Sequence, residues 1–154
     1  MIELLVVIVI VGILAGMGIA QYKVYMARAR DAVRVSDMQT IYKALLLRQT
    51  EKGCVPHVGD YHGHNAGAWD YSSQGNSFMP FLKTEGYLDK VPVDPINNME
   101  GDMTSGQYAY KYYCYPTAGV RLGYRRESDG REIYFHNQLG DSSYEPDNRF
   151  TCCP

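Results

Sequence analysis

Four cysteines carry the clearest chemistry in this sequence: Cys54, Cys114, Cys152 and Cys153. They form no C-x-x-C pair, so the usual zinc spacing is missing, and a bridge between the adjacent residues 152 and 153 would be strained. We therefore expect both C-terminal cysteines to bridge to Cys54 and Cys114, in either order, with free buried thiols as the alternative. Each bridge would contribute about 2–4 kcal/mol and would indicate an oxidising compartment outside the cytoplasm.

Two clusters of polar residues contain candidate metal ligands. The first lies in a Gly- and His-rich stretch and comprises His57, Asp60, His62 and His64. The second offers oxygen ligands for Ca²⁺ and comprises Asp94, Asn97, Asn98, Glu100 and Asp102. A solvated loop explains the first cluster more simply, and the spacing of the second fits no EF-hand loop. We therefore predict no cofactor, with Ca²⁺ as the weaker alternative.

The sequence contains no motif of an enzyme active site. The P-loop, G-x-S-x-G and H-E-x-x-H patterns are all missing, so we expect a protein that is not an enzyme. Aromatic and basic residues interleave at 110–115 and 123–127, a pattern that can stack on single-stranded nucleic acid. A half-buried β-sheet explains the same residues, so no specific nucleic acid is predicted as a partner.

Charge divides the 154 residues into three unlike segments. Residues 1–20 contain one charge, residues 21–50 contain six basic and two acidic residues, and residues 51–154 contain nine basic and fourteen acidic residues. The formal net charge of −2 gives no global argument for binding nucleic acid or an anionic membrane surface. The chain therefore consists of an apolar tip, a basic stem and an acidic head.

The apolar tip is long enough to cross a membrane as a helix. Residues 4–20 are uncharged and would span about 26 Å. A secretory signal peptide would begin with basic residues, whereas here Glu3 precedes the apolar run and Lys23, Arg28 and Arg30 follow it. We predict a single-pass membrane helix. By position alone, Glu3 would be a solvated residue at the headgroup level, where the helix dipole favours a negative charge.

The N-terminal string MIELLVVIVIVGILA resembles the start of type IV pilins and type II secretion pseudopilins. Glu3 matches the glutamate of that family, and Gly12 and the three residues after it fall in step. The resemblance implies that Glu3 pairs with the N-terminal amine of a neighbouring subunit during assembly. The family cuts its leader after a glycine and N-methylates a new terminal Phe. Met1 then corresponds to a position two residues after the cut, and the amine lies before it.

Three glycines, Gly12, Gly16 and Gly18, lie close together in the apolar helix. Each lowers helix stability by about 1 kcal/mol relative to Ala. Close packing between helices is one explanation. The resemblance implies another, because subunits of this family often lose helix here when they leave the bilayer and enter a filament. Many members have a proline just beyond this stretch, where this chain has Ala20.

Residues 22–52 contain neither Gly nor Pro and predict an amphipathic continuation of the helix that stops near Gly53. Apolar residues recur at spacings of three and four, namely Tyr25, Ala29, Ala32, Val35, Met38, Ile41, Tyr42 and Leu45. We expect this stripe to contact the head. The opposite, Arg-rich face would be solvated or would meet the acidic head of the next subunit.

These patterns predict two parts, a helix over 1–53 (an apolar half 1–20 and an amphipathic half 21–53) and a head over 54–154. A helix of about 78 Å cannot lie within a head of this size, so its first half must protrude.

The head predicts an α+β fold in which an antiparallel sheet packs on the helix. A long loop is expected at 54–79, a short helix near 77–84 and a polar tail at 140–154. The segment VPVDP at 91–95 resembles a segment that the same family places before its sheet. The expected strands, about three in number, are 107–115, 120–127 and 132–139.

The leading functional hypothesis is the major subunit of an extracellular type IV pilus-like filament, a homo-oligomer assembled through its N-terminal helices. The resemblance implies an inner-membrane precursor, a prepilin peptidase and a pilus assembly platform as partners. It also allows a type II secretion pseudopilin that forms a periplasmic pseudopilus. A membrane-anchored binding module that never polymerises is the alternative from a different class.

Overall fold

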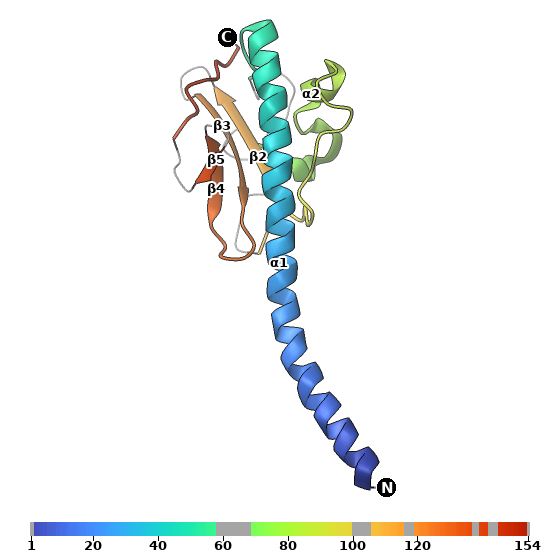
Figure 1. The fold of residues 1–154 in the computed structure, drawn as a ribbon. Helices are drawn as coiled ribbons and strands as arrows, with labels where there is room; N and C mark the ends of the chain where they lie inside the picture. Colours follow the sequence, from blue (N-terminus) through green and yellow to red (C-terminus); the bar gives the residue numbers. More distant parts are fainter. Residues whose placement is uncertain are drawn as a thin grey trace.

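A computed structural model describes residues 2–57, 69–99, 106–115, 119–136, 139–141 and 145–153. A single long helix, α1, precedes a head that contains a sheet and two short helical segments (Figure 1). The elements in chain order are α1 (Ile2–Lys52), β1 (Asp70–Tyr71), the 3-10 segment η2 (Ser72–Ser77), α2 (Pro80–Thr84), β2 (Tyr110–Tyr115), β3 (Gly119–Arg125), β4 (Glu132–His136) and β5 (Leu139–Asp141).

Helix α1 protrudes from the head over its first half, as predicted, and bends gently along its length (Figure 1). Among its described side chains, none before Asp31 is buried. The helix ends where the sequence indicates, because Gly53 adopts a positive φ of 79° and its N–H donates to the carbonyl of Gln49 at 2.9 Å. A left-handed glycine just after the last turn is a favoured helix stop.

Within the described residues the sheet has five antiparallel strands in the order β1-β2-β3-β4-β5, which is more than the three or so expected from the sequence. The three predicted strands are all present as β2, β3 and β4. The additional strands are β1, of two residues, and β5, of three, and both are too short to show a periodic pattern. The α+β architecture, with a long helix packed on a small antiparallel sheet, is confirmed and is consistent with a pilin-like fold.

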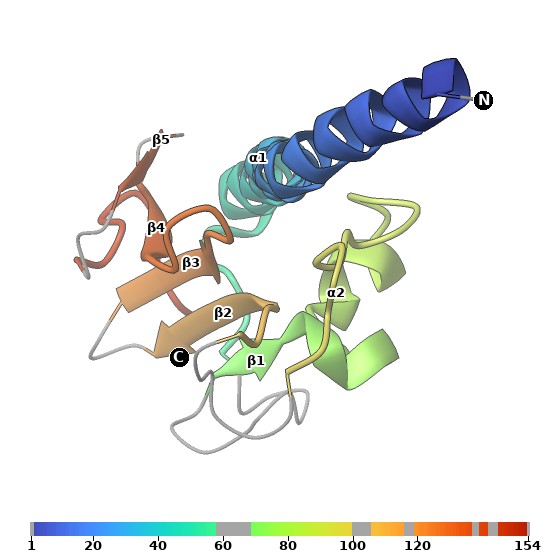
Figure 2. The same cartoon turned by 90° about the horizontal axis from the view of Figure 1, so that it is seen from below.

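One face of the sheet and the second half of α1 form the core. The strands bury alternate side chains, as a period of two requires, namely Tyr110, Tyr112, Cys114, Val120, Leu122, Tyr124, Ile133 and Phe135. Five α1 residues pack against them, namely Met38, Ile41, Tyr42, Ala44 and Leu45. Seen from below, the sheet and the η2–α2 segment form an arc beside α1 (Figure 2).

The prediction that the apolar stripe of α1 contacts the head is wrong for the N-terminal half of the stripe. Tyr25, Ala29, Ala32 and Val35 are exposed, although the four later members of the stripe are buried. At this level of α1 the residues turned to the head are the charged Asp31 and Arg34, which bind polar groups of the head.

The region expected to be a long loop, 54–79, contains β1 and η2 in its described part. Helix α2 lies within the predicted short helix and has Pro80 in its first turn, a position that lacks an intrahelical hydrogen bond in any case. The predicted C-terminal tail is tied to the body by backbone bridges between Val55 and Cys152 and between Val120 and Asp147.

Candidate functional site: the protruding helix and its attachment to the head

The apolar tip is fully exposed in the single chain. From Ile2 to Leu14, eleven Leu, Ile and Val side chains are each more than half exposed. Helix α1 is long and apolar enough to cross a membrane, and the window that meets this criterion is 0% buried. Monomeric soluble proteins rarely expose so large an apolar surface to water.

Glu3 lies in the first turn of α1, where the free backbone N–H groups favour a negative charge. It is exposed and forms no hydrogen bond or ion pair with the described residues of its own chain. Its predicted partner, an amine of a neighbouring subunit, lies outside this single chain.

The three glycines of the apolar tip lie within continuous helix. A Cβ added at Gly12 or Gly16 would meet no atom within 4 Å. Neither glycine is therefore required by packing inside the monomer. Glycine there matters only when another helix approaches closely or when the helix opens, which are the two explanations that the sequence offers.

A buried charge cluster, which we call the stem–head joint, fixes α1 to the head. Its members are Arg30, Asp31, Arg34, Asp94 and Glu127. Arg34 is completely buried and donates to both carboxylate oxygens of Asp94, at 2.7 and 3.0 Å. It also donates to Asp31 at 2.9 Å and to Glu127 at 3.3 Å. Arg30 donates to Glu127 at 2.8 and 2.6 Å.

The joint also organises the two loops that it contacts. Asp94 Oδ1 accepts the backbone N–H of Ile96 at 2.8 Å, which shapes the loop of the VPVDP segment. Asp31 accepts the backbone N–H groups of Glu127 and Ser128 at 2.8 and 3.0 Å and so holds the β3–β4 turn. One helical turn of α1 therefore holds two loops of the head at once.

The electrostatics of the joint favour its charged state. Burial alone would lower the pKa of Arg34, but the hydrogen bonds and charge attraction of Asp94, together with the hydrogen bonds to Asp31 and Glu127, raise the pKa. Burial raises the pKa of Asp31, yet the hydrogen bonds that it accepts from Glu127, Ser128 and Arg34 together bring this pKa below the ordinary value. The hydrogen bond from Arg30 lowers the pKa of Glu127.

The sequence alone did not reveal this joint. The Arg-rich face of α1 was expected to be solvated or to meet another subunit, but Arg34 is buried and Arg30 and Arg48 are ion-paired within their own chain. The available signals were the close spacing of Arg30, Asp31 and Arg34, and the aspartate of VPVDP.

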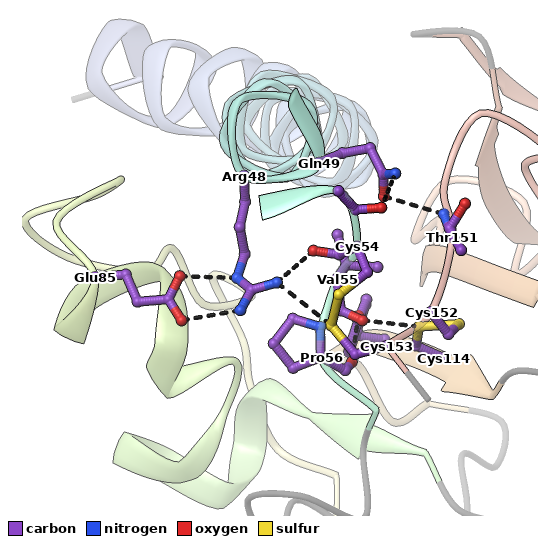
Figure 3. Close-up of a disulfide and its surroundings, with 12 residues drawn as sticks. Arg48, Gln49, Cys54, Val55, Pro56, Glu85, Cys114, Thr151, Cys152 and Cys153 are labelled. Carbon is purple, nitrogen blue, oxygen red and sulfur yellow. Dashed lines mark hydrogen bonds and ion pairs between the residues drawn. A yellow bond between two sulfur atoms is a disulfide. The ribbon is translucent and has the colours of Figure 1, made fainter. Parts of the chain in front are cut away.

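Two disulfides tie the C-terminal tail to the head (Figure 3). Of the two orders that the sequence leaves open, the structure has Cys54–Cys153, which we call the outer bridge, and Cys114–Cys152, which we call the inner bridge. Both cysteines of the inner bridge are buried, and both cysteines of the outer bridge are half-buried.

Arg48 links the outer bridge to α2, as Figure 3 shows. Its guanidinium donates to both oxygens of Glu85 at 2.8 and 3.0 Å and to the carbonyl of Cys54. Its Nη1 also lies 3.8 Å from the Sγ of Cys153. The Arg48 guanidinium, near the end of α1, thus contacts both the start of the following loop and the C-terminal tail.

The two candidate metal clusters are not assembled in the part of the chain that the structure describes, where no group of three or more His, Cys, Asp or Glu side chains could hold an ion. Asp94 is bound to Arg34, Asn97 is hydrogen-bonded to Ser72, and Asn98 is hydrogen-bonded to Gly106 and Tyr108. Of the remaining candidates, His57 packs against Tyr115, and Asp60, His62, His64, Glu100 and Asp102 lie outside the described residues.

Three residues of β2, Lys111, Tyr113 and Tyr115, lie on the face of the sheet opposite the core residues Tyr110 and Tyr112. Ring centroids are 5.1 Å apart for Tyr113 and Tyr115 and 5.1 Å for Trp69 and Tyr113. Lys111 lies over the rings of Trp69 and Tyr134, at 4.9 and 4.5 Å from their centroids. The half-buried sheet that the sequence predicted therefore uses these residues for contacts within the chain.

Comparison with known proteins finds no match for this chain, whether with family models, curated proteins or solved structures.

Proposed function

We propose that this chain is a structural subunit of an extracellular type IV pilus-like filament and that it assembles through residues 4–20 of α1. The observation that carries the proposal is the exposed apolar half of α1, which extends well beyond the head that its second half helps to form (Figure 1). The resemblance of the N-terminal string to pilins adds to this support, and so does the acid in its first turn.

Removing this segment from water is strongly favourable. Burying a Leu, Ile or Val side chain contributes about 1.5–3 kcal/mol, so the eleven exposed ones from Ile2 to Leu14 could contribute roughly 16–33 kcal/mol. Association and ordering oppose this by about 4–15 kcal/mol. The same side chains are equally satisfied in a bilayer, so helix packing and charge pairing decide whether the subunit stays in the membrane or enters the filament.

Glu3 is the residue that distinguishes these two states. An ionised carboxylate among packed apolar helices is stable only if a positive group compensates it, and the amine of a neighbouring subunit would do so. A wrong axial offset would leave both charges unpaired, so the pair would also fix the register between subunits.

The test compares Glu3→Gln and Glu3→Leu with a control variant, Asp89→Asn, which removes an exposed carboxylate from the head. Filaments are counted by electron microscopy of sheared surface material, and membrane-held subunits are measured in the same cells. We expect both Glu3 variants to insert into the membrane and to assemble poorly, and the control to assemble normally.

Normal filament yield from both Glu3 variants would contradict the proposed role of Glu3. A wild-type chain that inserts but forms no polymer would instead favour the membrane-anchored binding module. Short periplasmic polymers without surface filaments would favour the pseudopilin.

A further inference from the structure

A cavity of about 630 Å³ is lined by residues of η2, α2 and the loop after α2. One wall comes from this helical segment, including Phe78 and Pro80, and the other comes from the loop that contains Val91 and Val93. Phe78 is almost completely buried, and the lining is mainly apolar. Cavities of this size and character are typical of small-molecule sites.

The two walls are held together before any ligand binds. Ser72 donates to the side-chain oxygen of Asn97 at 2.7 Å, and the amide of Asn97 donates back to the carbonyl of Ser72 at 3.1 Å. The backbone N–H of Tyr110 in β2 donates to the Ser72 hydroxyl at 2.8 Å. The cavity is therefore built onto the sheet and is not a gap between loose loops.

Backbone conformations that are rare for side-chain-bearing residues cluster around this cavity. Asn97 has φ 48°, and Met79, next to the lining residues Phe78 and Pro80, has φ 43°. Gly75, which also lines the cavity, has φ 69° and ψ −128°. Such conformations persist where the surroundings enforce them, and they concentrate at ligand sites.

The charge at the cavity is opposite to that of the head around it. Lys83 and Lys90 both line it, and no carboxylate does among the residues that the structure describes. Both lysines are exposed, and neither forms an ion pair within the described residues. The cavity thus combines an apolar interior with two ammonium groups, on a head in which residues 51–154 hold fourteen acidic and nine basic residues.

We propose that this cavity binds a small amphipathic anion, with an aromatic or aliphatic body against Phe78, Val91 and Val93 and a carboxylate between Lys83 and Lys90. The apolar lining provides the contact area, and the two ammonium groups select an anion over a neutral molecule of the same shape. This binding site does not depend on the proposed filament and is available in a single subunit.

The test uses the ¹⁵N-labelled full chain in neutral-detergent micelles, with 4-phenylbutyrate as the anionic probe and 4-phenylbutan-1-ol as its neutral counterpart. We expect 4-phenylbutyrate to shift the amide resonances of Gly75, Phe78, Val91 and Val93 and to saturate on the order of 1 mM, as suits so small a probe. The alcohol should bind several-fold more weakly.

Two double variants, each of which removes two lysine charges, test whether Lys83 and Lys90 bind the anion. Lys83→Gln/Lys90→Gln should weaken 4-phenylbutyrate binding by about five- to tenfold and leave binding of the alcohol unchanged. The control, Lys43→Gln/Lys52→Gln, removes two exposed lysines from α1 that do not line the cavity, and it should bind like the wild type.

Three results would overturn the proposal. The first is equal binding of the acid and the alcohol, and the second is equal weakening in both double variants. The third is a shift of the cavity amides with protein concentration in the absence of probe, because a second copy of the chain would then occupy the cavity.

Discussion

The buried Arg34–Asp94 pair should be the most sensitive point of the stem–head joint. Both side chains are 0% exposed, and two charge-assisted hydrogen bonds of 2.7 and 3.0 Å join them. Asp94→Asn preserves the shape of the side chain and the oxygen that accepts the N–H of Ile96, whereas it removes the charge and replaces the Oδ2 that accepts from Arg34 Nε by an NH2 donor. The substitution therefore isolates the ion pair from the turn.

The size of the expected stability loss depends on which partners of the Arg34 guanidinium remain after Asp94→Asn. Removing one partner of a buried ion pair destabilises a protein by about 3–5 kcal/mol, because a charge is left uncompensated. Here Arg34 keeps Asp31 at 2.9 Å and Glu127 at 3.3 Å, so the lower end applies. We expect Asp94→Asn to lower the free energy of unfolding of the head by about 3 kcal/mol. Arg34→Met/Asp94→Asn should be no less stable than Asp94→Asn alone, since no buried cation is then left without its main partner.

The assay is urea unfolding of the full chain in neutral detergent, followed by the fluorescence of Trp69. This is the single tryptophan of the chain, and it lies in the head beside Tyr113. The control is Asp89→Asn, which neutralises an exposed acid in the same loop region and should change stability by less than about 0.5 kcal/mol.

A loss of less than about 1 kcal/mol for Asp94→Asn would refute this reasoning, because an exposed pair would behave in that way. Additive effects of Arg34→Met and Asp94→Asn in the double variant would refute it equally, since two residues in direct contact should be coupled.

Two further predictions concern pH and redox state. The lowered pKa values of Asp31 and Glu127 mean that their stabilising contribution is present above the ordinary carboxyl values of 3.8 and 4.5 and is lost as the pH falls through the lower folded-state values. Unfolding measured from pH 7 to 2 should therefore show an acid limb, and Glu127→Gln should flatten it; an unchanged limb would contradict this. Mild reduction should open the half-buried Cys54–Cys153 bridge before the inner bridge, as mass mapping of alkylated thiols would show, and simultaneous opening would argue against it.

The parts of the fold that follow from local pattern were predictable. The absence of Gly and Pro over 22–52 predicts the continuous helix, and Gly53 predicts its end. The three longer strands carry β-prone residues between turn signals, and all three are present. The bridging of the tail cysteines to Cys54 and Cys114 was also predictable, but its order was not, because order depends on where the tail lies in three dimensions.

The parts that depend on contacts between distant residues were not predictable. Asp94 lies 60 residues from Arg34 in the sequence, and no periodic pattern connects the two. For the same reason the apolar stripe was extended too far toward the N-terminus. Helical spacing identifies an apolar face but reveals neither where along the helix the head begins nor which face is turned to it. Tyr25 lies before the first buried residue of α1, whereas Val35 lies beside the buried Arg34 and is itself exposed.

The stem–head joint explains how α1 is held to the head although the N-terminal half of its apolar stripe is exposed. If an apolar stripe held α1 to the head at this level, the helix could slide or rotate with little change in contact area, because apolar packing is non-directional. The two-pronged contact between Arg34 and Asp94 has a fixed direction instead, and Asp31 anchors the β3–β4 turn beside it. The charge cluster thus fixes the orientation of the head relative to the stem and leaves Tyr25 and Val35 available to neighbours. In a filament built through residues 4–20, such a joint would pass the register set by the packed helices on to the surface formed by the heads.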